Sequence, residues 1–555
     1  MRIPINADCA ATLIVLMLVA LTPDPAQAQE QHAHSMPDPK SAMLLEGMGD
    51  VHHPITTSNP EAQKFFDQGL ALIYGFNREE AVRSFRRAAE LDPKAAMPYW
   101  GMALGVGPHI NMDVDSDVQP AAGYESIQKA LSLESATSAG ERALIEALAK
   151  RFSADPKADE RNLSIAYRKA MSEVARNYPD DLDAATLYAE SIMCLSRWDY
   201  YNNNGSAKDG TDELVAVLET VLRRDPYHLG ANHYYIHAVE ASPNPERALP
   251  SAARLMGLAP AAGHLVHMPG HIFLRTGDFS QTVFTNVRAV QADKDYVKQT
   301  NAAPGVYTMG YASHNIHFIV VGAAMQGRFA EAKKAADELA AYIAPGIDVM
   351  PPMVDYFGVN PLLVLYRFNR WDDILKLSEP SSKLQMTTVL WRFARCVALA
   401  SKGKLSEARE EQRAFEAVLA KVPADYQIGF SSVQTVMRVA KSIIEAKLAG
   451  DDRTAVEHWK RAVAAQDALR YNEPPDWFYP VRESLGSALL RAGRASEAEA
   501  VFREDLKQNP RNGRSLFGLM KSLEAQKKSS DADWVRREFE RAWKFADVQL
   551  RVEDL

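Results

Sequence analysis

The fold of this 555-residue chain follows from residues 62–95, AQKFFDQGLALIYGFNREEAVRSFRRAAELDPKA. Counted from the first of these residues, Gly69 falls at position 8 and Ala81 at position 20, where small side chains let two helices approach closely. Phe85 falls at position 24, and Pro93 at position 32 ends the second helix. The stretch therefore predicts a helix-turn-helix unit of 34 residues.

The same unit recurs along the chain. A second close copy starts at Tyr479, with Gly486 at position 8 and Phe502 at position 24. Weaker copies begin near Leu229, Gly263, Ser313, Val389 and Val436. In this pattern the chain resembles the tetratricopeptide repeat family over roughly 62–545. The resemblance implies an all-α right-handed superhelix, an α-solenoid, whose concave groove binds a protein or peptide partner.

Three segments also resemble a group of exported bacterial repeat proteins. They are FFDQGLALIYGFN at 65–77, HMPGHIF at 267–273 and EPPDWFYPVRESLG at 473–486. This resemblance implies no particular activity, because a repeat fold alone fixes no chemistry.

The N-terminus has the features of a signal peptide. An apolar run at 10–21 follows a short leader, and the small residues Ala26 and Ala28 suit a signal peptidase. The run of twelve residues is too short to span a bilayer, which needs about 20. We therefore predict a signal peptide at 1–28 and a periplasmic or secreted protein with no membrane span after cleavage. A retained membrane anchor is the alternative.

The rest of the chain reads as one continuous series of helical units. We predict an extended lead-in at 29–60, N-terminal repeats with insertions at 61–228, central repeats at 229–345, a connecting helical repeat at 346–388 and C-terminal repeats at 389–555. The segment at 472–480, NEPPDWFYP, is interpreted as a rigid connector between repeats.

Composition excludes two classes of protein. The chain has 63 Lys and Arg against 71 Asp and Glu, a net charge of -8, so it lacks the basic field that nucleic-acid binding needs. Its three cysteines are too few for a disulfide framework.

Histidine is concentrated in the central repeats, where eight of the 14 lie between 228 and 317. In the repeat from Leu229, position 5 is His233 and position 9 is His237. In the repeat from Gly263, the same two positions are His267 and His271. Position 5 of the third repeat is His317, and position 2 is histidine twice, at His264 and His314.

These positions share one helical face. At about 100° per residue, positions 2, 5, 9 and 12 point away from the packing positions 4, 7, 8 and 11. In the repeat family that face lines the concave groove, so the resemblance implies that the seven histidines share one concave surface. Glu240, at position 12 of the repeat from Leu229, joins them.

Such a cluster is suited to transition metals. Two imidazoles four residues apart on a helix can hold one ion at about 2.0–2.1 Å. Seven histidines and one glutamate exceed the needs of one ion, so we predict one or two ions with open positions. Imidazole and carboxylate suit zinc, copper, iron or nickel, and no cysteine is near enough in sequence for a thiolate zinc site. Met268 inside the cluster and the residues at 31–36, QHAHSM, favour copper slightly.

Several functions stay open at this point. Two three-histidine sets would suit a copper pair that handles dioxygen, whereas a mixed histidine and carboxylate set would suit hydrolysis. A copper, iron or zinc oxidoreductase or hydrolase is therefore one hypothesis. A histidine-rich groove for an acidic or aromatic ligand is a second, and an interaction scaffold without metal is a third. Pro269 interrupts the helix between His267 and His271 unless it lies in a first turn, and a late helix start would put His264 in an entry loop.

Overall fold

The computed structural model describes residues 42–111 and 119–555. The predicted signal peptide at 1–28 and the first part of the predicted lead-in lie outside the described residues. Within the described ranges, no helix combines the length and the apolar character needed to cross a membrane.

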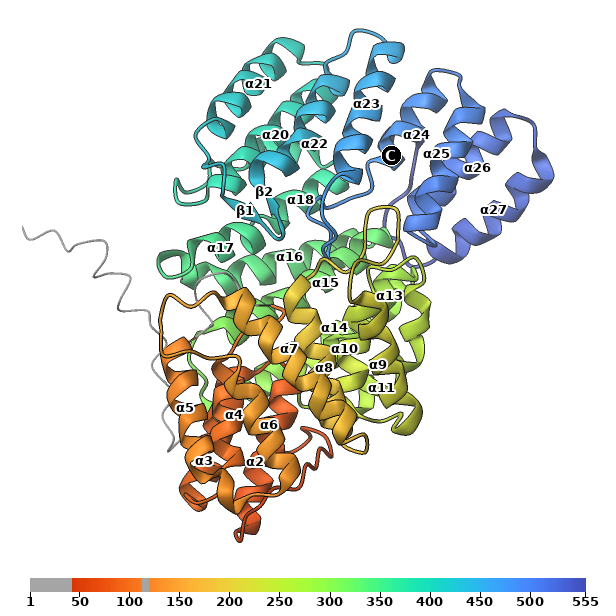
Figure 1. The fold of residues 1–555 in the computed structure, drawn as a ribbon. Coiled ribbons are helices and arrows are strands. Elements are labelled where there is room, and N and C mark those ends of the chain that lie inside the picture. Colours follow the sequence, from red (N-terminus) through yellow and green to blue (C-terminus); the bar gives the residue numbers. More distant parts are fainter. Residues whose placement is uncertain (1–41, 112–118) are drawn as a thin grey trace, which may run out of the picture.

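Helices make up most of the described chain, and they follow one another as packed pairs (Figure 1). The N-terminal helices are α2 (Pro60–Tyr74), α3 (Arg78–Leu91), α4 (Met97–Val106), α5 (Pro120–Leu133), α6 (Ala139–Ala149), α7 (Glu160–Asn177), α8 (Leu182–Met193) and α9 (Thr211–Arg224). The central helices are α10 (Leu229–Val239), α11 (Leu249–Leu258), α12 (Gly263–His267), α13 (Pro269–Arg275), α14 (Phe279–Thr300), α15 (Ala312–Met325) and α16 (Phe329–Ile343).

The second half continues in the same way. The connecting helices are α17 (Pro351–Gly358), α18 (Asn360–Arg367) and α19 (Trp371–Lys376). The C-terminal helices are α20 (Gln385–Ser401), α21 (Leu405–Leu419), α22 (Val433–Lys447), α23 (Asp452–Asp467), α24 (Arg482–Arg491), α25 (Ala495–Gln508), α26 (Gly513–Ala525) and α27 (Ser529–Ala542). Two short antiparallel strands, β1 (Gln427–Ile428) and β2 (Ser431–Ser432), precede α22. The predicted all-α, tetratricopeptide-like solenoid is confirmed.

The two repeats closest to the sequence pattern show how it folds. Gly69 of α2 faces the ring of Phe85 on α3, and a Cβ at Gly69 would lie 2.5 Å from that ring. Gly486 of α24 faces Phe502 of α25 in the same way. The residues at positions 8 and 24 therefore form the contact that closes each helix pair.

The solenoid curls so that the central helices are flanked by both ends of the chain (Figure 1). On one side, α10 packs against α2 as well as against α8, α9 and α11. On the other side, Asp547 beyond α27 accepts hydrogen bonds from the backbone N–H groups of Phe329 and Ala330, at 2.7 and 2.8 Å. The C-terminal tail therefore caps the start of α16.

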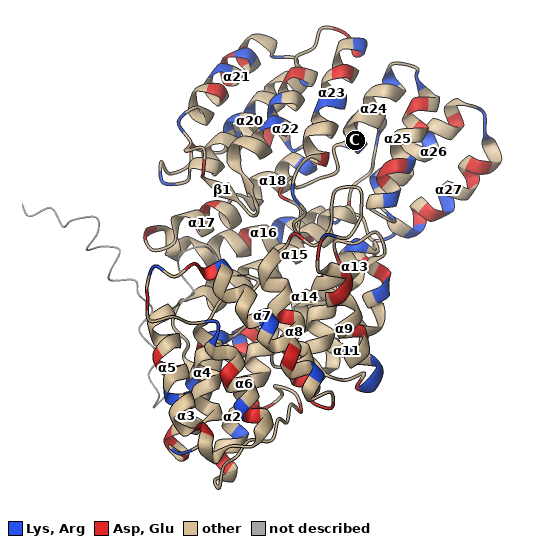
Figure 2. Ribbon diagram, in the orientation of Figure 1, with Lys and Arg blue, Asp and Glu red and all other residues tan. Residues whose placement is uncertain are grey.

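Acidic and basic residues are mixed along the outer helices α21, α25 and α27, whereas the central helix α15 contains no Lys, Arg, Asp or Glu (Figure 2). Among the described residues drawn in this view, Lys and Arg residues are interspersed with Asp and Glu residues along the helices.

Candidate metal centre

The predicted ligands lie on helices that pack together in the middle of the solenoid. They are His233 and His237 on α10, His264 and His267 on α12, His271 on α13, and His314 and His317 on α15. Glu240 is the residue that follows the last turn of α10.

Six of these histidines form two sets of three. Triad A is His233, His237 and His264, and triad B is His267, His271 and His314. In each triad, one nitrogen from every imidazole lies within 4.8 Å of the other two. The Nε2 atoms of His233 and His264 are 3.1 Å apart, and those of His267 and His271 are 2.8 Å apart.

Both triads follow one rule in the repeat numbering. Each takes the histidines at positions 5 and 9 of one repeat and the histidine at position 2 of the next. His317 stands at position 5 of the third repeat, but position 9 of that repeat is Val321. The ring of His317 packs against Tyr356 and Phe357 of α17, with ring centroids 5.9 Å apart in each case. The structure therefore places His317 outside both triads, although the sequence predicted that it joins them.

Pro269 separates His267 from His271 without moving them apart. It is the first residue of α13, where its missing N–H removes no helical hydrogen bond. His264 lies within α12 and not in an entry loop. The interruption that the sequence indicated is real, but it falls between two short helices that keep both rings in one triad.

Two ring orientations are fixed by oxygens that can only accept a hydrogen bond. The Nδ1–H of His233 donates to the carbonyl oxygen of Tyr74 at 2.6 Å. The Nδ1–H of His267 donates to Oδ1 of Asn286 at 2.6 Å, while the amide nitrogen of Asn286 donates to the carbonyl oxygen of Thr282. A neutral imidazole carries one proton, so Nε2 of each ring is left with a free lone pair.

Glu240 fixes one ring in each triad. Its two oxygens accept hydrogen bonds from Nδ1 of His237, at 2.7 Å, and from Nδ1 of His271, at 2.6 Å. Burial alone would raise the pKa of Glu240, but the two imidazoles, with His271 first, lower it to about 2. Glu240 is therefore an ionised carboxylate behind the rings. The sequence predicted it as a ligand, and the structure places it where it orients ligands.

The Nε2 atoms of His267 and His271 are close enough to share one ion. When both rings are neutral, each holds its proton at Nδ1, so the two Nε2 lone pairs face each other at 2.8 Å and repel. An ion about 2.0–2.1 Å from both nitrogens would relieve that repulsion, with an angle of about 85–90° between the two bonds. The same bond length fits the 3.1 Å separation of His233 and His264 with an angle of about 100°.

The environment favours the neutral form of five of the six imidazoles. Burial is the main cause, followed by neighbouring groups, and together they lower the pKa well below the usual value for His233, His264, His267 and His314. Burial also lowers the pKa of His237, although Glu240 opposes this. Nε2 of His237 is buried without a hydrogen-bond partner among the described residues. Neutral imidazole with a free lone pair is the form that binds a metal ion.

Aromatic rings enclose both triads. Phe76 packs against His233 and His264 of triad A, with centroid distances of 4.5 and 5.1 Å. Phe318 packs against all three rings of triad B, at 4.6, 4.7 and 4.9 Å. The triads are neighbours, because the ring centroids of His237 and His271 lie 5.6 Å apart, one ring from each.

The C-terminal half reaches this centre, which the sequence reasoning missed. The hydroxyl of Tyr471 donates to Glu473 at 2.8 Å and lies 3.4 Å from Oε2 of Glu240. The guanidinium of Arg275 stacks over the Tyr471 ring and donates to the carbonyl oxygen of Glu240 at 3.0 Å. The start of the predicted connector at 472–480 is therefore also part of the wall behind Glu240.

Of the missed residues, only Glu473 falls in one of the three segments that carry the resemblance to exported repeat proteins. All three segments nevertheless lie at or next to the centre. Segment 65–77 contains Tyr74 and Phe76, segment 267–273 contains two ligands of triad B, and segment 473–486 begins at Glu473.

No protein-family model and no curated protein matches this chain. Solved structures similar to it include the Cut9–Hcn1 hetero-tetramer of APC/C, with 13% identity over 88% of this chain and 75% of that chain and a TM-score of 0.30. They also include the human IFIT1 dimer with m7Gppp-AAAA, with 12% identity, coverage of 89% and 92%, and a TM-score of 0.31. Yeast Tom70 is similar at 10% identity, with coverage of 86% and 90% and a TM-score of 0.30. Similarities this low say nothing about the chemistry of this chain, so the centre is interpreted from its own geometry.

Proposed function

We propose that this protein holds a pair of transition-metal ions, one in each triad, and that the pair handles dioxygen. The observation that carries the proposal is the convergence of the Nε2 atoms in triad B, where those of His267 and His271 lie 2.8 Å apart. Nε2 of His237 and Nδ1 of His264 are buried without a hydrogen-bond partner among the described residues, and leaving such nitrogens unpaired destabilises a fold unless a ligand binds them.

Ligand type favours copper. Each triad offers three imidazoles, with no thiolate and with its nearest carboxylate, Glu240, turned toward Nδ1 atoms. Neutral imidazole suits copper, zinc, iron and nickel, whereas hydrolytic zinc sites and iron oxygenase sites commonly include a carboxylate ligand. Three protein ligands leave a coordination position open for dioxygen or a substrate.

Two neighbouring copper ions would supply two electrons together, whereas a single Cu(I) ion supplies one. Triad A and triad B would each hold one ion, and two Cu(I) ions held there would supply two electrons to one dioxygen molecule, with both ions oxidised to Cu(II). We therefore propose a copper-dependent oxidoreductase as the class of activity. From the signal predicted at 1–28 we also propose that it works in the periplasm or outside the cell.

A protein or peptide partner is the second candidate. The repeat architecture favours it, because solenoids of this kind present extended binding surfaces. Partner binding gives no role to the six converging imidazoles, and the two functions are compatible on different surfaces.

Elemental analysis of tag-free protein tests the metal pair. We expect two copper ions per chain after loading with Cu(I) without air, and uptake of one dioxygen per two copper ions on exposure to air. His317→Ala is the matched control, because His317 is a buried imidazole on α15 outside both triads. A chain that binds no copper, or a His317→Ala variant that loses an ion, would overturn the proposal.

A further inference from the structure

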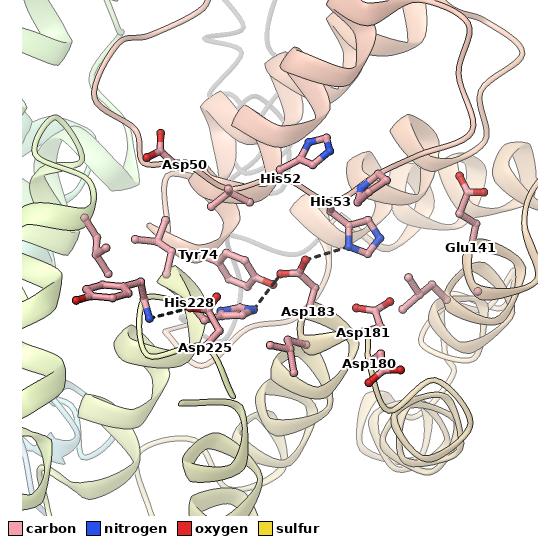
Figure 3. Close-up of a pocket in the computed structure, with 18 of the residues that line it drawn as sticks. Asp50, His52, His53, Tyr74, Glu141, Asp180, Asp181, Asp183, Asp225 and His228 are labelled. Atoms are coloured by element: carbon pink, nitrogen blue, oxygen red, sulfur yellow. Dashed lines mark hydrogen bonds and ion pairs between the residues drawn. The ribbon is translucent and has the colours of Figure 1, made fainter. Parts of the chain in front are cut away.

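A second group of possible ligands lies apart from the triads, in a cavity of about 940 Å³ (Figure 3). The cavity lies between the chain at 50–54 and the starts of α8 and α10. Its charged lining is acidic, and none of the described lining residues is Lys or Arg. The carboxylates are Asp50, Glu141, Asp180, Asp181, Asp183 and Asp225.

An imidazole and two of these carboxylates converge on one point. Nδ1–H of His53 donates a hydrogen bond to Oδ2 of Asp183 at 3.0 Å, and an ion bound by both atoms would replace that proton. With Asp181, they form a set whose ligand atoms all lie within 4.8 Å of one another. Figure 3 shows His53 and Asp183 pointing toward each other, with Asp181 beside them. The side chains of His53 and Asp183 are only 12% and 16% exposed.

Neighbouring groups hold Asp183 so that one oxygen faces this point. The Tyr74 hydroxyl donates to Oδ1 of Asp183 at 2.5 Å. Nδ1 of His228 accepts from the N–H of Ala231, so Nε2 of His228 carries the proton and faces the same Oδ1 at 3.3 Å. Two donors therefore occupy Oδ1, while Oδ2 accepts from His53.

Hydrogen bonds from residues outside the set also orient Asp181 and His53. Oδ1 of Asp181 accepts from the N–H of Ala184 as the N-cap of α8, which leaves its second oxygen available. The backbone N–H of His53 donates to Asp67 at 3.1 Å, and Gln63 donates to the His53 carbonyl oxygen at 2.8 Å. Outer hydrogen bonds that orient ligands in this way are the usual support of a metal site.

We propose that His53, Asp181 and Asp183 form a third metal site, which binds a divalent ion of the zinc type. One imidazole and two carboxylates with open positions toward the cavity suit zinc, and they differ from the all-imidazole triads. Because the cavity opens to solvent, the ion at this site exchanges with the surroundings. The site shares no ligand with either triad and does not depend on the function proposed above.

Zinc binding to the full chain tests this site. Equilibrium dialysis with zinc chloride, followed by elemental analysis, should give one ion that Asp181→Asn removes or weakens on the order of tenfold or more. Asparagine still caps a helix, so α8 should stay intact. His53→Gln should remove the same ion, and circular dichroism should show both variants folded.

Asp180→Asn is the matched control. Asp180 precedes Asp181, lines the same cavity and has a side chain that is 94% exposed, but it is outside the converging set. It should keep full zinc affinity. Equal weakening by Asp180→Asn and Asp181→Asn would show that the cavity attracts cations only through its charge, and zinc binding unaffected by Asp181→Asn would place the ion elsewhere. Either result overturns the site.

A further variant distinguishes zinc bound at this site from metal bound at the triads. His237→Ala/His271→Ala should still bind the zinc ion that Asp181→Asn removes. If the triads bind no metal, the wild type should bind one zinc ion, at this site. If this site binds no metal, Asp181→Asn should leave the zinc count of the wild type unchanged. The two failures can therefore be told apart.

Discussion

Triad A and triad B are copies of one arrangement set in different surroundings. Both take positions 5 and 9 of one repeat and position 2 of the next. Triad A is oriented and enclosed by the N-terminal repeats, through the Tyr74 carbonyl and the ring of Phe76. Triad B is oriented by Asn286 and enclosed by Phe318, both from the central repeats. The repeat pattern places the ligand histidines, and the curvature of the solenoid surrounds each triad with residues from different repeats.

The two triads meet at Glu240, which accepts a hydrogen bond from each. A single carboxylate therefore orients ligands of both proposed ions. The comparison predicts that changes fall into three groups: those that affect both ions, those that affect one ion, and those that affect neither.

The largest effect should come from losing both ions. A ligand at 100 times its dissociation constant stabilises the native state by about 2.7 kcal/mol, so each ion held that tightly should contribute about this much. A chelator should therefore lower the melting temperature of the wild type. It should leave that of His237→Ala/His271→Ala unchanged, since this variant lacks one ligand in each triad.

The control for this prediction is His317→Ala, which removes a buried imidazole outside the triads. Its melting temperature should fall with chelator as much as that of the wild type. Equal chelator responses of the wild type and the double variant would assign the metal to other residues.

Glu240→Gln should affect one ion more than the other. The carboxylate accepts from two Nδ1–H groups, but an amide has one acceptor oxygen and an NH2 group that donates. One histidine must then accept at Nδ1, carry its proton on Nε2 and lose its ability to bind metal. Titration with copper should show one ion retained and one weakened by about 10–100-fold. Two ions that are equally weakened, or both unchanged, would contradict the role given to Glu240.

How far the sequence predicts this centre depends on the kind of contact. The helix pairs follow from local pattern, because Gly69 and Phe85 are close in sequence and meet inside one repeat. The register also predicts which histidines share a face. It cannot predict that position 2 joins positions 5 and 9 of the preceding repeat, because that depends on how successive repeats stack. Glu240 was assigned to the right cluster, but its direction depends on rings from two repeats. Tyr471 reaches it across 231 positions, which no local pattern reveals.

Asn286→Ala should affect triad B alone. The variant removes the acceptor that fixes Nδ1 of His267, so this ring can rotate or change tautomer. We expect the ion in triad B to bind about tenfold more weakly, with the ion in triad A unchanged. Competition with a chelator of known affinity would measure the two affinities. Asn286→Asp keeps an acceptor oxygen and should bind nearly as tightly as the wild type, and the prediction is wrong if the two variants behave alike.

The smallest effect should come from Tyr471→Phe. The Tyr471 hydroxyl lies 3.4 Å from Glu240 and donates to Glu473, so its loss should lower the free energy of unfolding by about 1 kcal/mol without changing the metal count. Urea denaturation and elemental analysis of the same preparation would check both parts. Loss of an ion from this variant would mean that the C-terminal repeats take part in metal binding directly.

Anomalous diffraction at the copper edge from crystals of the copper-loaded protein would test the central claim most directly. Two peaks are predicted, one about 2.0–2.1 Å from Nε2 atoms in triad A and the other at the same distance from those in triad B, with the oxygens of Glu240 bound to neither. A single peak shared by both triads, a peak bound to Glu240, or no peak near these six histidines would contradict the account.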